Sequence, residues 1–89
     1  MYQYQPRAFV TAARVEALFA SNLQQSEQPT DAEVQAAIRG FVARHGHRAI
    51  AAMVAGQYGD HPIEAAARMC WCRSAVQQAY CCGSMAVAA

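Results

Sequence analysis

The sequence predicts an all-α domain, a small bundle of about four helices with a helix-turn-helix-like corner at Gly59–Pro62. Three observations lead to this fold class. The chain of 89 residues is 55% hydrophobic with a large share of alanine, the strongest helix former. Its larger apolar residues recur at helical spacing, without strand-like alternation. Residues that start or stop helices lie between these segments.

The first predicted helix begins at Thr11, which we expect to cap it. Val15, Leu18 and Phe19 then follow at the i, i+3, i+4 spacing of one helix face. The residues on either side of the bundle are predicted to be flexible ends of a single helical domain. The boundaries expected are a flexible N-terminus at 1–10, a domain at 11–82, a flexible tail at 83–89, and helices at about 11–22, 30–45, 47–58 and 62–80.

The second predicted helix opens with a capping box. The Thr30 hydroxyl is placed to accept the Glu33 N–H, while the Glu33 carboxylate reaches back to the Thr30 N–H. Val34, Ile38, Phe41 and Val42 share one face of this helix. We expect it to end at Gly46, and interpret Gly40 as a point where a neighbouring helix comes close.

The corner between the last two predicted helices is the best-specified feature of the chain. Gly59 suits the left-handed conformation at a helix C-terminus, and Pro62 suits the first turn of the next helix. His61, which precedes a proline, is disfavoured in α geometry, so Asp60 or His61 would be the N-cap. A chain reversal is therefore predicted here.

Two interpretations of this corner remain open. A short break containing glycine is typical of a DNA-binding helix-turn-helix, but it equally fits an ordinary helical hairpin. In the first case the protein would be a non-enzymatic DNA-binding regulator, acting as a dimer. The residues assigned to DNA would then be Arg44, Arg48, Arg68 and Arg73 on phosphates, with His61 and Arg68 near the bases.

Charge offers this hypothesis little support. The net charge is only +1, all seven basic residues are arginine, and no basic block occurs. A solvated face with salt bridges is the alternative explanation for the arginines. No signal peptide or transmembrane stretch is recognisable, so we expect a cytoplasmic protein with no membrane partner.

The second functional hypothesis is a protein-interaction module. Large core residues are few, so a homodimer or a protein partner is a reasonable expectation. The last helix carries apolar residues on two sides. We assign one side to the core and the other, Met69, Val76 and Tyr80, to a partner or a second copy.

The cysteines and histidines do not form a recognisable site. Cys70-Trp71-Cys72 and Cys81-Cys82 lack the spacing of a zinc knuckle, and Cys70 and Cys72 would project nearly opposite ways from a helix. His45, His47 and His61 fit roles at helix ends. We expect no enzyme activity, metal, cofactor or small-molecule substrate.

Two segments of the chain carry a family resemblance. ALFASNLQQSEQPT (17–30) contains an LQ-x-S-x-x-PT element, and QYGDHPIEAAARMCW (57–71) contains a YG-D/E-HP element followed by RM-x-W. In these elements the sequence resembles small, uncharacterised Ala/Arg-rich proteins of high-GC bacteria. The resemblance implies an intact small domain and no particular activity. Cys70 stands where those proteins have a basic residue after RM.

Overall fold

The computed structural model describes the backbone of residues 6–80 and the side chains of residues 9–80. It contains three α-helices, α1 (Pro6–Ala20), α2 (Asp31–Asp60) and α3 (Pro62–Tyr80), and one short 3-10 helix, η1 (Gln25–Glu27). No strand occurs in this part of the chain, so the all-α prediction is confirmed. Residues 1–5 and 81–89, which include Cys81 and Cys82, lie outside the described residues, and with them most of the flexible ends predicted at 1–10 and 83–89; residues 6–10 belong to α1.

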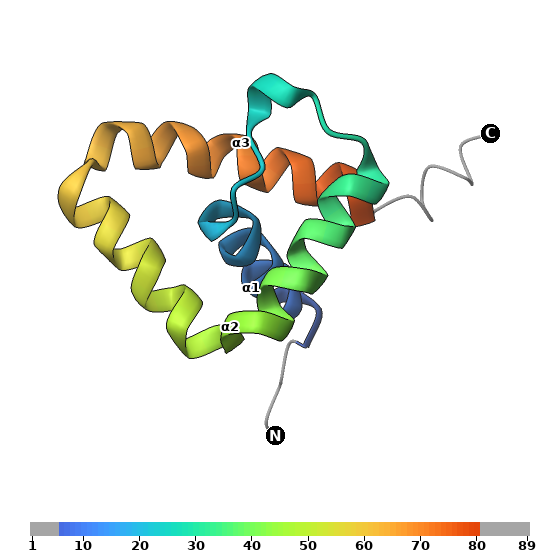
Figure 1. Ribbon diagram of the computed structural model, residues 1–89, viewed down its shortest axis with the longest axis horizontal. Helices are drawn as coiled ribbons and strands as arrows, with labels where there is room; N and C mark the ends of the chain where they lie inside the picture. Colours follow the sequence, from blue (N-terminus) through green and yellow to red (C-terminus); the bar gives the residue numbers. More distant parts are fainter. Residues whose placement is uncertain (1–5, 81–89) are drawn as a thin grey trace.

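The predicted number of helices was wrong, because the segments 30–45 and 47–58 form a single helix, α2. Gly46 lies inside α2 with φ 78° and ψ 161°, a conformation that is essentially restricted to glycine. The expected helix end is therefore a kink, and Figure 1 shows α2 changing direction there. The interpretation of Gly40 was also wrong, since a Cβ at this position would meet nothing within 4 Å.

The starts of α1 and α2 follow local sequence signals. α1 begins at Pro6, five residues before the predicted cap at Thr11, because proline is well suited to the first helical position. The capping box at Thr30 is confirmed: the Glu33 N–H donates to the Thr30 hydroxyl at 3.1 Å, and the Thr30 N–H donates to the Glu33 carboxylate at 2.9 Å.

The core lies where the three α-helices meet. α1 supplies Val15, Ala17, Leu18 and Phe19, and α2 supplies Val34, Ile38 and Ile50. The buried residues of α3 are spaced by alternating steps of four and three, which places them on one face: Ala65, Met69, Cys72, Val76 and Ala79. In Figure 1 the two halves of α2 and the whole of α3 form the sides of a triangle around α1. None of the described helices is both long and apolar enough to span a membrane.

The predicted reversal between α2 and α3 is confirmed, but Gly59 does not produce it. Gly59 lies within α2, which continues to Asp60, and only His61 separates the two helices. The His61 N–H donates to the Gln57 carbonyl at 2.7 Å, and the His61 carbonyl accepts from the Ala65 N–H at 2.8 Å. The chain thus turns sharply through one residue, at the corner drawn in gold in Figure 1.

Candidate functional site: an exposed apolar arm

The molecule divides into two regions that differ in packing. We call residues 6–50 and 65–80 the body, and residues 51–64, which include the end of α2 and the first turn of α3, the arm. Every residue of the arm except Val54 is exposed. Exposure increases outward, from 1% at Ile50 at the base of the arm to 37% at Met53 and 81% at Ile63. The arm therefore has no buried residue of its own.

The composition of the arm does not match its exposure. From Ala49 to Gly59 the sequence is AIAAMVAGQYG, which contains no charged residue. A helix on the surface normally has one apolar stripe and a charged opposite face, whereas a helix that is apolar all round is normally buried. Ile50, Val54 and Tyr58, spaced four residues apart on one side of this helix, end in an exposed tyrosine. This stretch has the composition of a buried helix, but it lies at the surface.

A hollow of about 510 Å³ separates the arm from the end of α1. Met53 and Gln57 line it from α2, Glu64 from α3, and Phe19 from α1. The Phe19 and Tyr58 rings stack at 5.9 Å between centroids and 7° between planes. This stack ties the outer half of α2 to the body, and it leaves the opposite side of the arm uncovered.

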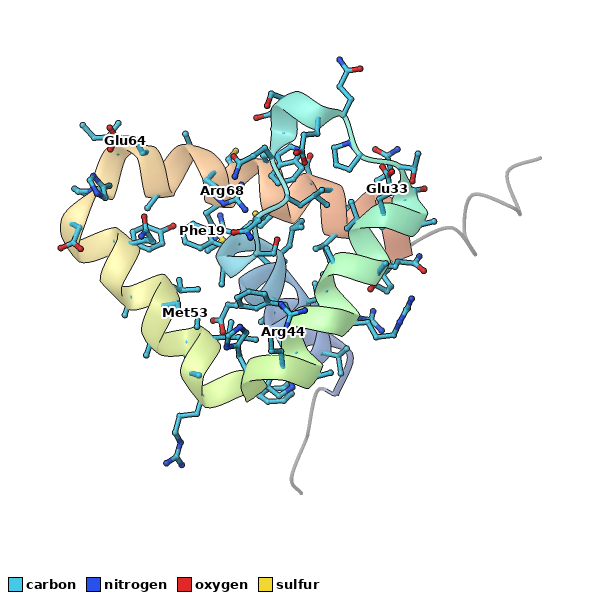
Figure 2. The ribbon with its side chains drawn as sticks, in the orientation of Figure 1. Phe19, Glu33, Arg44, Met53, Glu64 and Arg68 are labelled. Atoms are coloured by element: carbon cyan, nitrogen blue, oxygen red, sulfur yellow. The ribbon has the colours of Figure 1, made fainter. Side chains whose placement is uncertain are left out.

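Arg68 lies at the base of this hollow and holds the end of α1. Its guanidinium donates to four carbonyl oxygens there: Leu18 at 3.0 Å, Phe19 at 2.8 Å, Ser21 at 3.0 Å and Leu23 at 2.9 Å. Figure 2 shows Arg68 beside Phe19 near the middle of the molecule. α1 has no basic residue in its own last turn, so Arg68 supplies the positive charge that a helix C-terminus favours.

The position of Arg68 points to a structural role that was not predicted from the sequence. The Nε and Nη2 groups of Arg68 donate to these four carbonyls, so this edge of the guanidinium is engaged within the fold. Local sequence patterns do not reveal this contact, because Arg68 and the carbonyls lie 45 to 50 residues apart.

The other residues assigned to DNA are exposed but do not converge. Arg44 and Arg48 lie on either side of the kink in α2, His61 lies at the corner, and Arg73 lies on α3. Because helices rise about 1.5 Å per residue, the helical stretch between positions 48 and 60 alone is about 18 Å long. Figure 1 places the kink and the corner at two different vertices of the triangle.

The partner face predicted on α3 is not at the surface. Met69 is 7% exposed and Val76 is 1% exposed, so both are core residues, and α3 has one apolar side rather than two. Tyr80 is half-buried, with the Arg14 guanidinium 3.8 Å above its ring centroid. The prediction failed because the side assigned to a partner is the one that packs against α1 and α2, whereas the other side is exposed, at Ile63, Ala67, Cys70 and Ser74.

Cys70 and Cys72 do point in different directions, as the helical spacing predicted: Cys70 is exposed and Cys72 is buried. Burial raises the pKa of the Cys72 thiol to about 11, partly offset by the nearby positive charge of Arg68. Among the described residues, no three His, Cys, Asp or Glu side chains are grouped so as to hold a metal ion.

A second apolar surface lies at the start of α1, where Phe9 is 62% exposed and Val10 is 39% exposed. These residues border a groove of about 460 Å³ against Val42 and His47 of α2. The five residues before α1 lie outside the described part of the chain. The arm is described over its whole length and is thus the better-defined surface.

The described residues define a small three-helix α protein with one projecting apolar corner. No protein-family model, curated protein or solved structure matches this chain.

Proposed function

We propose that this chain is a small non-enzymatic protein-interaction module that binds its partner through the arm. The observation that carries the proposal is the uncharged helical stretch Ala49–Gly59, of which Ile50 alone is buried. The hypothesis of an interaction face is thereby moved from Met69 and Val76 to a surface that a partner is able to reach.

The energetics of burial support this surface. Fully burying one large aliphatic or aromatic side chain contributes about 1.5–3 kcal/mol. Ile63 is 81% exposed, so nearly all of this gain is available on binding, and Met53 and Tyr58 add smaller shares. Asp60 and Glu64 are exposed at the corner and would form a polar rim around an apolar centre.

DNA binding is a second candidate, favoured by one observation. Arg44 and Arg48 are both exposed beside the kink, where they could contact phosphates. Two phosphate contacts correspond to a slope of about −1.8 in log K against log salt concentration, which indicates weak, non-specific binding. A fluorescence-anisotropy titration with random duplex at low salt tests it, and absence of binding would remove this candidate.

The main proposal is tested by photo-crosslinking in the cells that make the protein. A photo-reactive amino acid at Ala52 is exposed on the arm, and the same group at Ala36 is exposed on the first half of α2. We expect protein crosslinks from position 52 and few from position 36. Equal yields from the two positions, or none from position 52, would contradict a binding role for the arm.

A further inference from the structure

We infer that the partner of the arm is a second copy of this chain, and that the two arms pair antiparallel across a two-fold axis. The inference rests on the proposed function, since it names the occupant of the same surface. It is carried by the distribution of charge at the two ends of the arm.

The two ends of the outer half of α2 carry opposite charges. Arg48 lies at its base and Asp60 at its tip, and the residues Ala49–Gly59 between them carry no charge. Beyond these two, Arg44 extends the basic end and Glu64 the acidic end; Figure 2 shows Arg44 on the first half of α2 and Glu64 at the far corner. All four side chains are exposed, and none has an ion-pair partner within the described part of the chain.

Two copies of this charge distribution place opposite charges against each other in only one orientation. In a two-fold interface each contact occurs twice, with residue i of one copy against residue j of the other. If the axis passes near Val54, then Arg48 of each copy lies opposite Asp60 of the other. A parallel pairing would instead bring Arg48 against Arg48 and Asp60 against Asp60. The charges therefore select the antiparallel dimer and disfavour the parallel one.

The middle of the arm fits the same arrangement. Ala52, Ala55 and Gly59 lie on the side of α2 opposite Ile50, and all three are exposed. Small side chains allow two helices to approach closely, and the exposed Ile63 of each copy would cover an edge of the contact. Since only about 18 Å of helix is shared, the interface is small, and we expect a dimer that dissociates on dilution.

The test measures the oligomeric state of the purified full chain by sedimentation velocity over a range of concentrations at low salt. The wild-type chain is expected to form a dimer. Ala55→Asp places two carboxylates close to the axis and is expected to abolish the dimer. The matched control, Ala36→Asp, makes the same change at an exposed alanine on the other half of α2 and should leave the dimer intact. Circular dichroism checks that both variants are folded.

Exchange of the charges tests the orientation. Arg48→Glu alone should weaken the dimer on the order of tenfold, because it faces Asp60 of the other copy. Adding Asp60→Arg should restore the wild-type dimer. The two positions are too far apart within one chain for this rescue to be intramolecular.

Each failure has a separate meaning. A wild-type chain that stays monomeric, or an Ala55→Asp variant that stays dimeric, overturns self-pairing through the arm. A dimer that is lost on Arg48→Glu and not rescued overturns the antiparallel arrangement. The crosslinking experiment remains independent of these results: products of a different mass from position 52 of a monomeric chain would retain the proposed function and assign the arm to another protein.

Discussion

The body and the arm share α2 and α3 and both contain large apolar residues, but only the body is packed. Ile50 and Ile63 are thirteen positions apart and are 1% and 81% exposed. The difference arises from α1, which has 15 residues against 30 in α2 and 19 in α3. Because α1 is the shortest helix, it covers only part of its neighbours. An apolar residue is therefore buried here according to whether α1 reaches it, which local composition does not reveal.

The largest expected effect comes from truncating the two isoleucines. Ile50→Ala removes a fully buried side chain and should lower the free energy of unfolding by about 2–5 kcal/mol. Ile63→Ala removes an exposed side chain and should change it by no more than about 0.5 kcal/mol. Urea unfolding followed by circular dichroism measures both, at concentrations low enough to keep the chain monomeric.

Similar losses from the two variants would break the comparison between body and arm, because they would place Ile63 in a packed environment. If Ile63→Ala costs stability only at high protein concentration, the comparison is sharpened instead. The covering surface would then belong to a second copy, since association stabilises the folded chain more as its concentration rises.

A somewhat smaller effect is expected at the junction of the two regions. Arg68→Met removes the donors to the carbonyls of Leu18, Phe19, Ser21 and Leu23. It should lower the free energy of unfolding by about 2–3 kcal/mol, because hydrogen bonds to a charged group contribute about 1.5–3 kcal/mol each and are not additive. The same urea experiment measures the change.

Arg73→Met is the matched control, an exposed arginine on the same helix, and should stay within about 0.5 kcal/mol of wild type. Equal effects from the two substitutions would mean that the end of α1 does not depend on Arg68.

Local signals predicted much of this fold. Thr30 with Glu33, and Pro62 after His61, each fix a helix start through contacts within a few residues. The periodicity of Val15, Leu18 and Phe19 identified a core face correctly. Gly46 was identified as a break, but whether the chain ends a helix or kinks there depends on what the following segment packs against, which is not a local property.

The candidate site was less predictable, since it depends on long-range contacts. Arg68 and Arg73 are five residues apart and look alike in the sequence, yet one binds the end of α1 and the other is exposed. In the sequence pattern, Met69 and Val76 fit a second apolar side of α3 as well as they fit the core, and the structure buries both. The sequence does contain one signal of the arm. The absence of charge from Ala49 to Gly59 indicates that this helix has no charged face adapted to solvent.

The smallest expected effect concerns the direction of the arm, which the kink at Gly46 sets. Gly46→Ala should destabilise the protein by about 1–3 kcal/mol, because a residue with a Cβ is strained at φ 78°, although the Cβ itself would meet no atom. Gly40→Ala is the control in the same helix, where the backbone is helical and the space is also open. It should stabilise the protein by up to about 1 kcal/mol, since alanine favours helix. Opposite signs in urea unfolding would place the strain in the backbone at Gly46. Stabilisation by both substitutions would mean that α2 is straight in solution, and a straight α2 would carry its outer half away from α1 and separate the stacked rings of Phe19 and Tyr58.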